Sequence, residues 1–173
     1  YNKLHILFIL ANQWAVMNVK EIFDSALKDP SLLSTLDIDN LLKSLDNEKS
    51  DYLEKKTITG INKEIFNTLQ ENILGVEPQK VACNKLIGYR LVDELHELHK
   101  GKHIRWIRKG TYNLTNGGNV VDVKFLDTGT HILCKNSMNR FIQYKYDDCL
   151  TFQKMSPTEM LILMAYDHAS TIT

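Results

Sequence analysis

Residues 103–153 decide the fold, and they read HIRWIRKGTYNLTNGGNVVDVKFLDTGTHILCKNSMNRFIQYKYDDCLTFQ. Apolar residues recur here at close to every second position. This period is typical of strands, because successive side chains of a strand point to opposite faces. We predict six short strands, over residues 103–108, 111–114, 119–126, 130–135, 140–146 and 149–153. Strands of this number and length predict a small antiparallel β-barrel or an SH3-like sheet.

Turn residues separate these segments, and most of them tolerate a positive φ. They are Lys109-Gly110, Asn116-Gly117-Gly118, Asp127-Thr128-Gly129, residues 136–139 and Asp147-Asp148. Behind the last strand, Ser156-Pro157-Thr158-Glu159 forms a capping box with proline at the first helical position. A final helix is therefore expected to begin there and to run to about His168.

Helical patterns fill the first hundred residues. Helices are predicted over residues 4–28, 38–45, 59–75 and 78–100, with a polar linker at residues 46–58. In the last of these helices an apolar stripe is formed by Leu86, Tyr89, Val92 and Leu95. The chain is therefore expected to be α+β, with a helical region over residues 1–101 and a β-domain with a C-terminal helix over residues 102–173.

Charge and cysteine content limit the setting of the protein. The 21 basic and 21 acidic residues cancel, so no global field attracts nucleic acid or an anionic membrane. Three cysteines without a C-x-x-C spacing fit a disulfide framework poorly. We expect buried thiols, with a Cys134–Cys149 disulfide as the alternative. The predicted location is a virion or the cytoplasm, in a reducing compartment, and not secretion.

An apolar run at residues 4–11 is the most hydrophobic segment of the chain. It is too short to span a membrane, because a spanning helix needs about 20 apolar residues. A buried helix, or one inserted into a partner protein, explains it better than a signal-peptide core. The predicted partner-binding residues are Leu4, Ile6, Leu7, Phe8, Leu10 and Trp14.

A basic stretch around the first strand suggests a second kind of partner. It contains Lys102, Arg105, Arg108 and Lys109, with Trp106 between them. Basic side chains beside an aromatic ring are what single-stranded nucleic-acid binding uses. Strand alternation nevertheless places Trp106 and Arg105 on opposite faces. A core tryptophan in a strand whose edge carries charge explains the same residues.

Catalytic chemistry finds little support in the motifs. His96 and His99 share a face of the predicted helix, with His103 nearby, but they lack the H-E-x-x-H spacing of zinc proteases. A solvated helix end explains these histidines without a ligand. No serine lies in a G-x-S-x-G elbow, and no cysteine has a local nucleophile signature. We therefore expect a protein that is not an enzyme and that holds no metal and no cofactor.

Three segments carry a resemblance to a known family. They are residues 103–108 (HIRWIR), 114–118 (LTNGG) and 152–159 (FQKMSPTE). Together they resemble a small domain of nucleocytoplasmic large DNA viruses, over about residues 100–168. The resemblance implies a conserved virion or minor capsid component, with no catalytic residues to carry over.

Three functional hypotheses follow. The first is a structural or adaptor protein that contributes to a larger assembly with other proteins, as an oligomer or a hetero-complex. The alternative is a nucleic-acid-binding module that uses Lys102, Arg105, Arg108 and Lys109. The third is a metal-dependent enzyme centred on His96 and His99.

Overall fold

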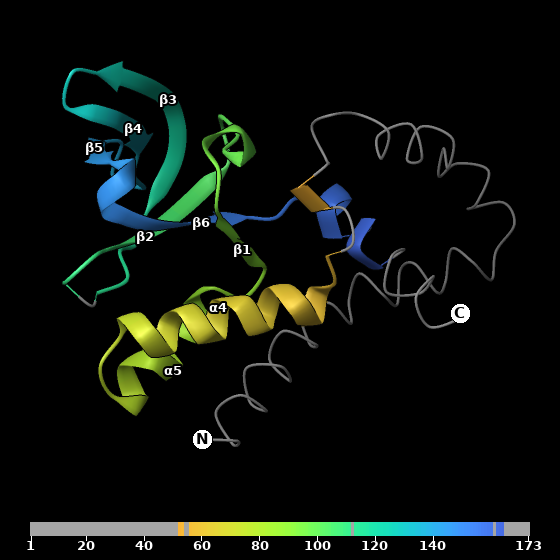
Figure 1. The fold of residues 1–173 in the computed structure, drawn as a ribbon. Helices are drawn as coiled ribbons and strands as arrows, with labels where there is room; N and C mark the ends of the chain where they lie inside the picture. The colour runs from red at the N-terminus through yellow and green to blue at the C-terminus, as the bar shows by residue number, and fades with distance from the viewer. Residues whose placement is uncertain (1–51, 54–55, 112, 161, 165–173) are drawn as a thin grey trace, which may run out of the picture. The chain divides into compact units, whose positions relative to one another are not determined.

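The computed structural model describes residues 52–53, 56–111, 113–160 and 162–164 (Figure 1). The chain divides into two compact units, residues 1–63 with 155–173 and residues 64–154, and each is described by itself. The helices predicted over residues 4–28 and 38–45 lie outside the described residues, as do the predicted partner-binding residues of the apolar run. No helix within the described ranges is long and apolar enough to cross a membrane.

Helix α4 (Ile58–Asn72) confirms the helix predicted from residue 59. The side chain of Thr57 begins it, since its Oγ1 accepts a hydrogen bond of 2.9 Å from the Gly60 backbone N–H. Apolar residues at four-residue steps form its buried face, because these positions lie one above another on a helix. They are Ile61, Ile65 and Leu69, and Ile73, which directly follows the helix, is buried as well.

The helix predicted over residues 78–100 is wrong beyond Lys85. Helix α5 (Val76–Lys85) ends where Gly88 takes a positive φ of 75°. The chain then forms strand β1 (Tyr89–Val92) and the single 3-10 turn η2 (Leu95–Glu97). A helix and a strand would both bury most of the apolar stripe. The pairing of β1 with the distant strand β6 favours the strand.

Six antiparallel strands form one sheet in the order β1-β6-β2-β3-β4-β5. Besides β1, these are β2 (His103–Arg108), β3 (Gly118–Leu126), β4 (Gly129–Lys135), β5 (Phe141–Lys145) and β6 (Cys149–Lys154). Five of the six predicted strands are thus confirmed. The strand predicted at 111–114 is wrong: a turn follows β2, and Leu114 makes only an isolated bridge with Ile107.

The predicted antiparallel sheet is present, but it does not close into the barrel that we gave as one of its two forms: the sheet is open and curled. The two edge strands, β1 and β5, do not pair with each other. Side chains span the gap instead. The ring of Trp106 in β2 stacks on that of Tyr144 in β5, with centroids 4.3 Å apart. The Tyr146 hydroxyl, in the turn η3 (Tyr146–Asp148), donates a hydrogen bond of 3.0 Å to the Val92 carbonyl.

The core of the sheet lies inside this curl. Its buried members are Val92, Leu98, Ile104, Trp106, Val120, Ile132, Cys134, Tyr144 and Cys149. Cys134 and Cys149 are both buried free thiols, as expected from the cysteine count, and they form no disulfide. Close packing of aromatic and branched side chains in this space supplies the main stabilisation of the sheet.

The capping box at the start of the last helix is confirmed. The Ser156 N–H donates to Glu159 Oε2 at 2.6 Å, and the Glu159 N–H donates to Ser156 Oγ at 3.2 Å. The hydroxyl of Tyr52 donates to Glu159 Oε1 at 2.6 Å. Helix is described at residues 157–160 and 162–164, and its predicted end near His168 lies outside the described residues.

Gly117 generates the first prediction. Its φ is 77°, and a Cβ there would collide with the Ile104 carbonyl oxygen. Gly110 has a similar φ of 84° but nothing within 4 Å of its Cβ position. We expect Gly110→Ala to lower the free energy of unfolding by roughly 1–2 kcal/mol, the cost of a left-handed backbone, and Gly117→Ala by clearly more. Urea denaturation measures both, and equal losses would contradict the collision.

Candidate functional site

The structure does not bring the four predicted nucleic-acid-binding residues into one patch. Alternation along β2 places Lys102 and Arg108 on the face of Trp106, and Arg105 on the other face. Lys109 follows the strand and donates a hydrogen bond of 2.9 Å to the Asp147 carbonyl. Trp106 is 7% exposed and stacked on Tyr144, so it offers no open platform for a base.

A different set of side chains does come together around Arg105, and we call it the cationic row: Tyr89, His103, Arg105 and Lys154. Tyr89 of β1 lies opposite Lys154 of β6. The β2–β6 register, which pairs Ile104 with Gln153, brings His103 beside Lys154. Three neighbouring strands therefore contribute to one face of the sheet.

Tyr89 and Thr115 hold Arg105 in place within the cationic row. The Arg105 Nε donates to the Tyr89 hydroxyl at 3.4 Å, and its guanidinium carbon lies 5.8 Å from the centre of the Tyr89 ring. Arg105 Nη1 donates to the Thr115 carbonyl at 3.1 Å. On the other side, the Tyr89 hydroxyl lies 3.0 Å from His103 Nδ1. Each polar atom named here has a partner within the row or its adjoining loop.

The electrostatics of the cationic row are positive. Burial lowers the pKa of His103, and the nearby charges of Arg105 and Lys154 lower it further. The imidazole is therefore neutral at pH 7, and the two permanent cations carry the charge. Among the described residues, Arg105 and Lys154 have no carboxylate partner within ion-pair distance. This arrangement can donate hydrogen bonds to an anionic group.

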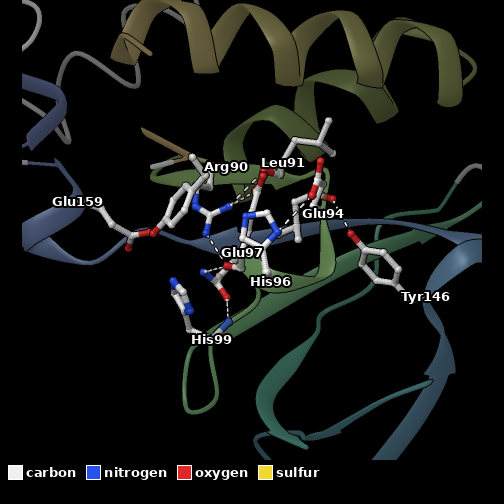
Figure 2. Close-up of polar contacts among 11 residues, drawn as sticks. Arg90, Leu91, Glu94, His96, Glu97, His99, Tyr146 and Glu159 are labelled. Atoms are coloured by element: carbon white, nitrogen blue, oxygen red, sulfur yellow. Dashed lines mark hydrogen bonds and ion pairs between the residues drawn. The ribbon is translucent and has the colours of Figure 1, made fainter. Parts of the chain in front are cut away.

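The opposite face of β1 and β6 carries a buried polar network, drawn in Figure 2. Arg90 Nη1 lies 2.7 Å from Glu97 Oε2, and Arg90 Nη2 donates to the Glu97 carbonyl at 2.6 Å. Gln153 donates to the same carbonyl at 3.2 Å and accepts from the His99 N–H at 2.7 Å. The Arg90 and Glu97 side chains are only 3% and 6% exposed, so the network acts as internal support.

The histidines of the third hypothesis, His96 and His99, do not share a helix face, because the turn η2 replaces the helix. His96 is exposed and lies 3.2 Å from Glu94. His99 joins the buried network through its backbone, and His103 belongs to the cationic row. Within the part of the chain that the structure describes, no group of three His, Cys, Asp or Glu side chains is placed to hold a metal ion.

The three thiols are poorly suited to nucleophilic chemistry. Burial raises the pKa of Cys83 and of Cys134 to about 11, and it raises the pKa of Cys149 as well. A thiol attacks as the thiolate, so these side chains are protonated and unreactive at neutral pH. They are core residues of the described region.

Besides Val121 of β3, large apolar side chains of the described residues are exposed in three places. The corner between α4 and α5 carries Leu74, Val76 and Val81, beside a surface groove of about 400 Å³. The turn between β4 and β5 carries Met138 and Phe141. The third place, which we call the hairpin tip, is the end of the β3–β4 hairpin, where Phe125 is 75% and Leu126 is 48% exposed.

Comparison of the chain with protein-family models, with curated proteins and with solved structures finds no match in any of the three. Sequence reasoning named Arg105 but missed its neighbours Tyr89 and Lys154. Tyr89 was assigned to a helix, and no local signal shows that Lys154 lies beside it. The exposure of the hairpin tip also has no signature in the sequence, because Phe125 fits the strand alternation equally well as a core residue.

The buried ion pair generates the second prediction. Glu97→Gln removes the carboxylate that lies 2.7 Å from the buried Arg90 guanidinium, which we expect to cost about 3–5 kcal/mol of unfolding free energy. Glu94→Gln is the matched control: it removes the same charge from an exposed partner of His96 and should change stability by less than about 0.5 kcal/mol. Urea denaturation measures the unfolding free energy of both variants. Equal losses in the two variants would contradict a supporting role for the buried ion pair.

The third prediction concerns His103. Because its pKa is lowered in the folded state, the unfolded chain binds more protons below pH 6.5, the ordinary value for histidine. The stability that this group contributes is therefore present at neutral pH and lost as the pH falls toward the folded pKa. Arg105→Leu removes one neighbouring cation and should raise the His103 pKa, measured by NMR titration. Arg108→Leu removes the same charge elsewhere on β2 and should leave that pKa unchanged.

Proposed function

We propose that this chain is a structural or adaptor protein that binds other proteins in a larger assembly. The exposure of Phe125 and Leu126 at the hairpin tip carries the proposal. Burying apolar surface releases about 25 cal/mol per Å², so two large side chains left in water favour association. Exposed apolar side chains that gather in one place mark interaction surfaces.

The hairpin tip is exposed because the β3–β4 hairpin extends beyond the core. Strand β2 pairs with β3 only at Gly118 and Asn119. The remainder of β3 is held by β4 alone, and Figure 1 shows the hairpin reaching away from β1 and β6. Phe125 follows the partly buried Val123 on the same face of β3, but no strand lies across from it. The Phe125 side chain is therefore exposed and open to contact with another molecule.

A role in binding rather than in catalysis is supported by the chemistry of the described residues. Their thiols are buried and protonated, and their histidines are not placed to share a metal ion. Their buried ion pair supports the sheet. The finer proposal, that the assembly is a virion and the chain a minor capsid component, rests on the resemblance of residues 100–168 alone. The apolar run at residues 4–16 remains a predicted second contact.

One experiment tests both the assembly proposal and the nucleic-acid alternative. Light scattering of the purified chain across a salt series, with and without single-stranded and duplex nucleic acid, separates the two. Apolar association holds or strengthens as salt rises, whereas phosphate contacts weaken steeply. We expect association without nucleic acid that persists at high salt.

The variant arm of this fourth prediction removes the hairpin tip. Phe125→Ser combined with Leu126→Ser should reduce the association, while Val76→Ser, which changes an apolar residue exposed to 63% elsewhere, should not. A monomer at every salt concentration whose only complex forms with nucleic acid and dissolves in salt would sink the proposal.

A further inference from the structure

Strand β3 has a free edge. Val120 makes the last backbone bonds on that side, accepting from the Gly101 N–H at 2.8 Å and donating to the Lys102 carbonyl at 2.9 Å. Residues 122–126 pair with β4 on their other side, Val121 is the extra residue of a β-bulge in that pairing, and no strand of the described region pairs with residues 121–126 on this side. Half of the backbone groups of such an edge have no protein partner, which makes it a template for another strand. We call residues 121–125 the β3 edge.

The sequence of the β3 edge is complementary to itself. It reads Val121-Asp122-Val123-Lys124-Phe125, so one acidic and one basic residue stand symmetrically about the central valine. In an antiparallel pair of two such edges with a two-fold axis at Val123, Asp122 of each copy lies opposite Lys124 of the other. Val121 then lies opposite Phe125, and both of these side chains are exposed in the single chain, to 38% and 75%.

From this complementarity we infer that the β3 edge binds the β3 edge of a second copy of the chain, antiparallel and with the two-fold axis at Val123. The inference rests on the proposed function and names the partner of the same hairpin. The interface is isologous, since the same patch serves both copies, and it therefore closes as a dimer. Two six-stranded sheets become continuous across it.

Opposite charges and apolar pairs each favour this register. Directly opposed residues of an antiparallel pair are close enough to interact, and opposite charges or apolar pairs stabilise the sheet. Because of the two-fold axis, the Asp122–Lys124 pair occurs twice, as does the Val121–Phe125 pair. Shifting the register by one residue would place Lys124 against Val123 and would lose both charge pairs.

The other edges of the sheet fit a second copy less well. In β5 a two-fold axis at Gln143 would place Lys145 against Phe141, with no acidic partner. In β1 the Val92 carbonyl already accepts a hydrogen bond from the Tyr146 hydroxyl, and the Arg90 side chain is buried in the Glu97 network. The charge pattern thus selects β3 among the free edges of the described sheet.

Charge reversal tests the pairing, as the fifth prediction. Lys124→Asp places two carboxylates against each other at two positions, and we expect the dimer dissociation constant to rise roughly tenfold or more. Asp122→Lys should act likewise, and it also removes the Lys100–Asp122 ion pair of 2.6 Å within the chain. The double variant restores opposite charges in both positions and should recover most of the affinity. Sedimentation equilibrium at low salt measures all three.

Lys135→Asp is the matched control, because it makes the same charge change on the neighbouring strand β4, outside the proposed interface. Dimerisation of this variant should equal that of the unchanged chain. A Lys124→Asp effect no larger than that of Lys135→Asp, or a double variant as weak as the single ones, overturns the pairing. In either case, association that persists at high salt would still support the proposed function, through a surface other than the β3 edge.

Cross-linking tests the register independently of affinity. A mixture of the Asp122→Cys chain with the Lys124→Cys chain should form a disulfide between the two variants under mild oxidation, while either variant alone should not. The natural thiols interfere little, because all three are buried and protonated. Cross-linking within a single variant would place the axis elsewhere, and no cross-linking in a sample that still associates would rule out this edge. A chain that shows no association at all would contradict the proposed function as well.

Discussion

The stack of Trp106 on Tyr144 is the contact on which the shape of the sheet depends. These rings belong to β2 and β5, which are separated by two strands in the sheet order, so their contact requires the sheet to curl. The Tyr144 hydroxyl then lies 3.0 Å from the Thr151 Oγ1 of β6 inside the core. Burial raises the pKa of Tyr144 well above its ordinary value, even though the hydrogen bond with Thr151 lowers it, so the hydroxyl stays protonated. The curl encloses the apolar core without closing the backbone into a barrel.

The two faces of the β1–β6 pair carry different sets of polar side chains. One face holds Arg90 and Gln153 in the buried network, and the next residues along each strand, Tyr89 and Lys154, belong to the cationic row. Because neighbouring residues of a strand point to opposite faces, fixing Arg90 and Gln153 also fixes the directions of Tyr89 and Lys154. The positive charge of the row is thus held in place by a salt bridge that solvent does not reach.

Features that depend on a few neighbouring residues were predicted from the sequence. The alternation of β2 to β6, the turns with positive φ and the Ser156–Glu159 capping box were all visible in short windows. Strand β1 was missed because Leu86, Tyr89 and Val92 recur every three residues, a spacing that suits a helix until the pairing with β6 is known. Arg105 was recognised as basic, but its neighbours Tyr89 and Lys154 come from distant positions of the chain. Whether the sheet closes into a barrel depends on whether its edge strands β1 and β5 pair, and these strands are far apart in the sequence.

The position of β6 has a consequence for synthesis on the ribosome. This strand is the last of the sheet to be made, yet it lies between β1 and β2. The meander from β2 to β5 can form as it emerges, since its neighbours in sequence are neighbours in space. Strand β1 has no partner until Lys154 has left the exit tunnel, so the nascent chain carries two open edges until then. A chain truncated before residue 149 keeps them open, and we expect it to be a substrate for chaperones or for aggregation.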